Sequence, residues 1–170
     1  MGPVSAKTTI DVPREAVYEL LGDLASRGAF TDHFIDEFRL QRIESAGVGA
    51  TARFRVADRR FWMETVIADM EPPFRLAERG RGGRLDRIPV STVWEVVEGP
   101  APSSCEVTVT FVTEPQGIVD RIPDFAANLR GAERWYRRQW SRALARLKAL
   151  AESGEEPGRV VVAGADRVPS

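Results

Sequence analysis

Glu64 is the residue of this sequence best suited to general acid or base chemistry. It is flanked by apolar residues, and a carboxyl group facing an apolar interior holds its proton more tightly than one in water. Such a group could move protons in a dehydration or an aldol cyclisation. The alternative is an ion pair across a sheet with an arginine of a neighbouring strand, such as Arg53, Arg55 or Arg79. The ion pair is the more ordinary arrangement of the two.

His33, the single histidine, is the second candidate for proton transfer. Its imidazole could titrate near neutral pH at the entrance of a binding site, and a solvent-exposed ring is the alternative. One histidine without a Cys or His at ligand spacing does not make a metal site. No metal or redox cofactor is indicated. Cys105 alternates with Val107 and Val109, which predicts a small core residue rather than a nucleophile.

A long helix near the C-terminus is the clearest of the elements that must position these groups. Apolar residues at steps of three and four predict one amphipathic helix over residues 120–152, with arginines on its outer face. Its inner stripe comprises Phe125, Leu129, Ala132, Tyr136, Gln139, Trp140, Ala143, Leu147 and Leu150. A buried hydroxyl or amide group on that stripe needs a hydrogen-bond partner, either in the backbone or in a ligand.

Strands account for most of the chain before this helix. Alternation of apolar and polar residues predicts strands over residues 4–12, 35–43, 51–56, 61–70, 74–79, 90–98 and 105–113. Two short helical segments are expected at 13–24 and 26–34, after the first strand. Ile43 is out of phase with its strand, which predicts a bulge, and Gly80, Gly82 and Gly83 are expected to form a turn.

This order of elements predicts an α+β fold. Short connections favour an antiparallel meander, so about six or seven strands would form a curved sheet around the long helix. Residues 4–152 are expected to form one domain, and residues 153–170, which lose all periodicity, a flexible tail.

Two stretches carry a resemblance to a known group of proteins. TTIDVPREAVYELLGDL near the start and TVWEVVEG followed by SSCEVTVTF before the long helix resemble the helix-grip, or SRPBCC/START-like, superfamily and its polyketide cyclase/dehydrase-like branch. The resemblance implies a deep pocket for a hydrophobic small molecule between sheet and helix. It makes ligand-binding candidates of Trp62, Arg79, Trp94, Tyr136, Gln139 and Trp140, and catalytic candidates of Glu64 and His33. Packing of the tryptophans as ordinary core residues is the alternative.

The composition of the chain limits the kinds of partner that it is expected to bind. The 170 residues include 24 basic and 25 acidic ones, a net charge of −1, which favours neither nucleic acid nor an anionic membrane as partner. The single cysteine excludes an internal disulfide and fits a reducing cytoplasm. The opening MGPVSAKTTID does not have the pattern of a secretory signal. No apolar run approaches the roughly 20 residues of a membrane-spanning helix, so stable membrane insertion is not expected.

Three functions remain open at this point. The first is a monomeric or homodimeric cytoplasmic protein that binds an aromatic polyketide-like or lipid-like molecule and has cyclase/dehydratase-like activity. The second is a carrier or sensor with the same pocket and no chemistry. The third is a co-chaperone-like interaction module whose cavity is filled by its own side chains.

Overall fold

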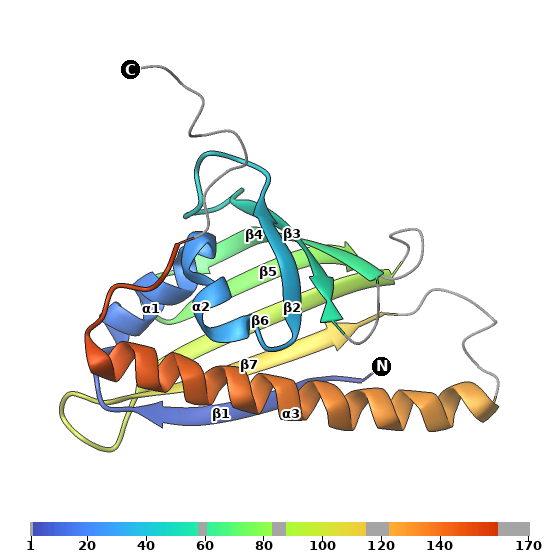
Figure 1. Cartoon of the computed structure of the whole chain (residues 1–170). Helices are drawn as coiled ribbons and strands as arrows, with labels where there is room; N and C mark the ends of the chain where they lie inside the picture. Colours follow the sequence, from blue (N-terminus) through green and yellow to red (C-terminus); the bar gives the residue numbers. More distant parts are fainter. Residues whose placement is uncertain (1, 58–60, 83–87, 115–122, 160–170) are drawn as a thin grey trace.

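A seven-stranded antiparallel sheet, curled into a half-barrel, forms the frame of the protein (Figure 1). The computed structural model describes residues 2–57, 61–82, 88–114 and 123–159, with the backbone alone at residues 61 and 123–130. The strands are β1 (Val4–Ile10), β2 (Ile35–Leu40), β3 (Thr51–Val56), β4 (Phe61–Glu71), β5 (Arg75–Gly82), β6 (Ile88–Glu98) and β7 (Cys105–Thr113). Their order in the sheet is β1-β7-β6-β5-β4-β3-β2.

Helices follow the first and the last strand. After β1 come α1 (Arg14–Gly22), a short 3-10 helix η1 (Leu24–Ser26) and α2 (Gly28–Thr31), and the chain ends its regular structure with α3 (Pro123–Ser153). The predicted fold class is therefore confirmed. The predicted start of the long helix at residue 120 lies outside the described residues. The predicted tail begins where α3 ends, and its residues 160–170 also lie outside them.

Alternation within the strands determines which side chains face the interior. In β7, Cys105, Val107, Val109 and Phe111 are buried, whereas the residues between them are half-buried. The same period of two places Ala52, Phe54 and Val56 of β3 inside. One face of the curled sheet is therefore mostly apolar, as this period predicts for a sheet covered on one side.

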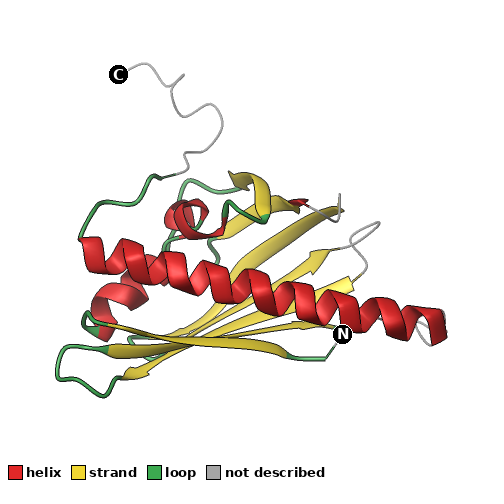
Figure 2. Ribbon diagram, turned by 60° about the horizontal axis from the view of Figure 1, so that its bottom comes forward, coloured by secondary structure: helices red, strands yellow, loops and turns green. Residues whose placement is uncertain are grey.

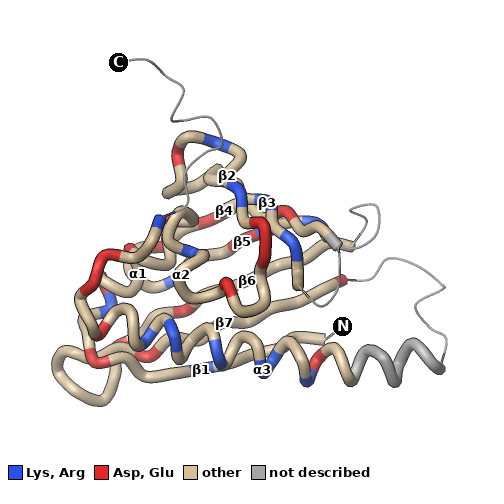
Figure 3. The backbone as a smooth tube through the Cα atoms, viewed as in Figure 1, with Lys and Arg blue, Asp and Glu red and all other residues tan. Residues whose placement is uncertain are grey.

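Helix α3 covers that surface with its apolar stripe. Tyr136, Trp140, Ala143 and Leu147 of the predicted stripe are buried, and Gln139 is half-buried. The helix runs alongside β1 (Figure 2), where Lys148 Nζ donates a hydrogen bond of 2.8 Å to the carbonyl oxygen of Thr9 in that strand. Basic residues recur along α3 (Figure 3). Arg134, Arg137, Arg138 and Arg142 are exposed, so the charged face of the helix is turned to solvent.

Two local predictions are wrong. Ile43 lies in a loop after β2 and is 86% exposed, and the irregularity in this strand falls between Asp36 and Arg39 instead. Gly80 and Gly82 belong to β5 rather than to a turn, and Gly83 of the predicted turn lies outside the described residues. A Cβ atom at Gly80 would overlap the carbonyl oxygen of Glu64 in β4. Gly80 thus permits β4 and β5 to approach each other closely, and a glycine within a strand often has this role rather than forming a turn.

Candidate functional site

A small cavity lies between the curled sheet, the segment from η1 to β2, and α3. It offers about 30 Å³ to the centres of water-sized molecules. Most of its surface is apolar. Its lining residues are Leu24, Arg27, Phe34, Ile35, Phe38, Phe54, Val56, Met63, Glu64, Thr65, Glu78, Val90, Thr92, Phe111, Tyr136 and Trp140. These residues come from segments far apart in the sequence, so the cavity exists only in the folded chain.

A buried ion pair forms the most polar part of this lining. Arg27 Nη2 lies 2.6 Å from Glu78 Oε1, and the two side chains are only 4% and 5% exposed. Glu78 also accepts hydrogen bonds from Trp94 Nε1, at 2.8 Å, and from Thr65 Oγ1, at 2.9 Å. Both carboxylate oxygens are thereby engaged. A buried carboxylate with a cation and two further donors has the partners that its burial requires.

Local structure holds Arg27 over this carboxylate. Arg27 lies between η1 and α2, and its Nη2 donates a second hydrogen bond, of 3.2 Å, to the carbonyl oxygen of Leu21. Thr31 Oγ1 donates to the carbonyl oxygen of Arg27 at 2.7 Å. The guanidinium carbon lies 4.9 Å from the ring centre of Trp94 and 5.6 Å from that of Phe30. The aromatic faces stabilise the buried cation further.

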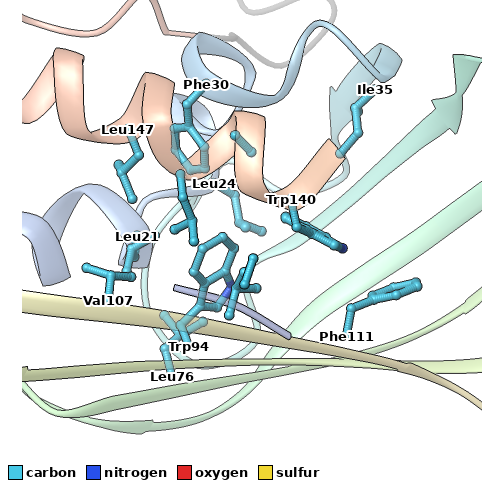
Figure 4. Packing of buried hydrophobic residues seen from close by; sticks show 14 of the residues in the cluster. Leu21, Leu24, Phe30, Ile35, Leu76, Trp94, Val107, Phe111, Trp140 and Leu147 are labelled. Carbon is cyan, nitrogen blue, oxygen red and sulfur yellow. The ribbon is translucent and has the colours of Figure 1, made fainter. Parts of the chain in front are cut away.

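Aromatic rings from the sheet and α3 meet next to the ion pair (Figure 4). The ring of Trp140 contacts Trp94, Phe34 and Phe111, with centres 5.5, 5.2 and 5.9 Å apart. Phe111 also packs on Tyr136, at 4.9 Å. In Figure 4 the ring of Trp140 extends away from Trp94, with its nitrogen at the far end. The contacts of Trp140 with Trp94 and Phe34 are edge-to-face, and such contacts fix the orientation of the rings.

Three buried nitrogen atoms lack a hydrogen-bond partner among the residues that the structure describes. They are Arg27 Nε, Trp140 Nε1 and His33 Nδ1. The first two belong to residues that line the cavity. Buried polar groups are nearly always satisfied, so a water or a bound molecule that reaches these N–H groups would complete their hydrogen bonds.

Three of the predicted ligand-binding residues come together at this site. Tyr136 and Trp140 line the cavity directly. Trp94 is fully buried behind them, where it contacts Trp140 and donates to Glu78. Gln139 is half-buried on α3 and is not part of the lining.

The other predicted ligand-binding residues lie on the opposite face of the sheet. Trp62 is half-buried there, with the guanidinium groups of Arg39 and Arg53 at 5.7 and 5.1 Å from its ring. Arg79 is exposed. The period of two explains this placement, because Met63 and Thr65, which alternate with Trp62 and Glu64 in β4, are the residues that face the interior.

Glu64 is an exposed residue at the margin of the cavity. Its neighbours in register are Arg53 of β3 and Arg81 of β5. The apolar surroundings on which the catalytic hypothesis depended are therefore not present around its side chain, and a proton-transfer role for Glu64 stays a prediction.

His33 is not part of the cavity lining. It lies in the loop that follows α2, where this loop contacts α3. Its Nε2 is 3.2 Å from the carbonyl oxygen of Gln139, and its ring packs on Phe34 at 4.9 Å. Burial lowers the pKa of His33 below its usual value of 6.5, and the neighbouring charges of Arg142 and Arg146 lower it further. The ring is accordingly neutral at pH 7, and its catalytic role also stays a prediction.

Sequence reasoning missed Arg27 and Glu78, the charged pair inside the cavity. Glu78 shares the phase of Leu76 in β5, and Arg27 follows Leu24 by three residues. That shared phase was the available signal. This signal was weak, because charged residues are seldom fully buried unless they are paired. The sequence does not reveal such a pair when its members are 51 positions apart.

The described residues also limit other kinds of site. Among them, no group of three or more His, Cys, Asp or Glu side chains could hold a metal ion. In the same part of the chain, no helix is both long enough and apolar enough to cross a membrane.

A half-barrel sheet closed by one long C-terminal helix over an internal cavity defines the helix-grip class of proteins. The chain belongs to the family described as polyketide cyclase / dehydrase and lipid transport, which residues 1–152 match. Family and fold together support a domain that binds hydrophobic ligands. A comparison with curated proteins finds no match.

Solved structures with this fold are distant in sequence. TTHA0849 from Thermus thermophilus has a TM-score of 0.65 at 19% identity, over 91% of this chain and all (100%) of that one. A START superfamily protein from Mycobacterium smegmatis has a TM-score of 0.63 at 13% identity, over 89% and 97% of the two chains. DynU16, from the dynemicin biosynthetic locus, has a TM-score of 0.60 at 17% identity over 93% of this chain, which spans about half (49%) of DynU16. At these identities the likeness shows the fold alone.

Proposed function

We propose that this protein binds a hydrophobic small molecule, aromatic polyketide-like or lipid-like, in the cavity between the sheet and α3. The observation that carries the proposal is the largely apolar cavity, whose lining combines aromatic rings with a few buried polar groups. Small-molecule sites usually have this composition. Membership of a polyketide cyclase / dehydrase and lipid transport family supports the same function.

The cavity must enlarge before such a molecule can enter. Its 30 Å³ suffices for about two water molecules, whereas small-molecule pockets span about 300–1,000 Å³. The edge strand β2 is the place where opening would disturb least. It pairs with β3 alone, and its register is broken between Asp36 and Arg39. Phe38 of this strand stacks on Phe54 of β3, with ring centres 5.8 Å apart, over the cavity.

The small volume also favours a second candidate function. A protein-interaction module whose interior is filled by its own side chains needs no larger void than this one. The two functions differ in whether the interior ever accepts a guest.

Native mass spectrometry of the freshly purified protein would test the proposal. We expect an adduct of one small molecule per chain, released by denaturation and identified by its mass. The same spectrum gives the oligomeric state, and we predict a monomer or a homodimer. Absence of an adduct, together with no binding of added aromatic ketones or acyl lipids, would contradict ligand binding and favour the interaction module.

Incubation of the loaded protein would separate carrier from enzyme. A carrier releases the molecule unaltered, whereas cyclase/dehydratase-like activity would change its mass by the loss of water or its chromatographic retention at equal mass. The Glu64→Gln and His33→Gln variants then test the two predicted catalytic residues. Retained turnover in a variant would remove that residue from the mechanism.

A further inference from the structure

Two side chains that line the cavity each carry a buried hydrogen-bond donor that the described part of the protein leaves unpartnered. These donors are Arg27 Nε and Trp140 Nε1. Both oxygens of Glu78, a buried carboxylate of the lining, are engaged within the protein. The buried polar atoms that lining side chains leave without a partner are therefore N–H donors.

Donors of this kind discriminate between guests. A plain hydrocarbon chain would cover both N–H groups without accepting from either, and would exclude the water that could. Leaving a buried donor unpaired costs more than a hydrogen bond ordinarily gains. A guest with oxygen atoms on an apolar frame avoids this cost, and displacement of water by a group that reproduces its hydrogen bonds preserves affinity.

Charge selects among oxygen-bearing guests. Arg27 and Glu78 form a pair at 2.6 Å inside the protein, so the cation is already neutralised. A carboxylate guest would add an unbalanced negative charge next to Glu78 in surroundings that exclude water, where an isolated charge is costly. A neutral carbonyl oxygen accepts hydrogen bonds without this cost.

On the basis of the function proposed above, we propose that the guest is an uncharged, oxygenated apolar molecule with a ketone- or ester-type carbonyl group. Arg27 Nε–H and Trp140 Nε1–H donate to its oxygen atoms, while the surrounding rings contact its frame. Plain acyl chains and carboxylates are the classes of ligand that the cavity disfavours.

The test compares probes that share one frame, namely tetralin, α-tetralone and tetralin carboxylate. Titration calorimetry gives the affinity of each for the full-length wild-type protein, and NMR spectra of isotope-labelled protein follow the side-chain N–H groups of Arg27 and Trp140. We expect α-tetralone, which has one carbonyl oxygen, to shift at least one of the two N–H resonances downfield and tetralin to bind without shifting either. Tetralin carboxylate should bind more weakly than α-tetralone.

Two tryptophan variants provide the matched comparison. Trp140→Phe keeps an aromatic ring and removes the donor, so the preference for α-tetralone over tetralin should fall roughly three- to tenfold, the worth of one hydrogen bond. Trp62→Phe removes an indole N–H from the outer face of the sheet and should leave this preference unchanged. The wild-type NMR shifts decide the question even if Trp140→Phe does not fold.

The outcomes separate this inference from the proposed function. If tetralin and α-tetralone both bind while neither N–H resonance moves, the cavity binds ligands and the inference is wrong. Tightest binding by the carboxylate would likewise overturn it. If no probe binds, both the proposed function and this inference are wrong.

Discussion

At the scale of single residues, the Arg27–Glu78 pair is the feature on which the interior most depends. Its charges are almost fully buried, and Trp94 and Thr65 complete the hydrogen bonds of the carboxylate. Removal of one buried partner leaves an uncompensated charge, whereas replacement of both by apolar groups is often tolerated. The pair therefore constrains which substitutions the protein accepts.

We expect Arg27→Met to lower the free energy of unfolding by about 3–5 kcal/mol, because Glu78 would stay buried without its cation. The double variant Arg27→Met/Glu78→Leu should recover part of that loss. Urea denaturation followed by circular dichroism measures both. Arg75→Met is the matched control, since Arg75 pairs with Asp69 and Glu71 at the exposed surface, where a pair is worth about 1 kcal/mol or less. Equal losses in Arg27→Met and Arg75→Met would contradict the argument.

At the scale of elements, α2 and the two residues that follow Thr31 pack against α3. His33 Nε2 lies within hydrogen-bond distance of the carbonyl oxygen of Gln139, and Arg146 of α3 pairs with Asp32. Protonation of His33 would place a cation in a partly buried position near Arg142 and Arg146, with Asp32 as the opposing charge. This contact should consequently weaken in acid.

The pKa of His33 is lower in the folded protein than its unfolded value of 6.5. Between these two pKa values the unfolded chain binds more protons than the folded protein. The contribution of neutral His33 to the free energy of unfolding is therefore fully present above pH 6.5 and is lost as the pH falls through the folded pKa. Chemical denaturation at a series of pH values from about 7.5 to about 5 should show this decline. His33→Gln, which removes the only histidine, should reduce it. An identical decline in wild type and variant would show that His33 is not its cause.

At the scale of the whole molecule, the curled sheet and α3 enclose an interior that is close-packed apart from a small void. Side chains such as Phe38 and Phe54 fill the space between the edge of the sheet and the helix. Packing of this kind stabilises the fold and at the same time limits the size of a guest. Stability and capacity should therefore change in opposite directions when a lining side chain is shortened.

Phe38→Ala should show this trade-off. Loss of the half-buried ring should cost up to about 3 kcal/mol of stability, since full burial of Phe is worth about 3–5 kcal/mol. It should also strengthen the binding of a three-ring ketone such as anthrone, because the cavity is enlarged beside Phe54. Calorimetric titration and thermal unfolding measure the two effects. Phe74→Ala, at an exposed phenylalanine, is the control, and weaker anthrone binding by Phe38→Ala would contradict the trade-off.

The sequence by itself determined the elements and their class. Periods of two and of three to four residues identified the strands, the two short helical segments and the stripe of α3, because these patterns depend on residues that are neighbours along the chain. The limits of this reasoning appear at Ile43 and Gly80, where a loop and a close approach of strands depend on other segments.

Only the tertiary structure decided which candidates share a site. Trp94, Tyr136 and Trp140 lie together at the cavity, and Glu64 is an exposed residue at its margin. Trp62 and Arg79 lie on the other face of the sheet, because a shift of one position in a strand moves a side chain to that face. The pair of Arg27 and Glu78 is 51 positions apart in the chain, and no local pattern connects them. Their contact arises when the segment after α1 folds across β5, and the polar chemistry of the cavity comes from that contact.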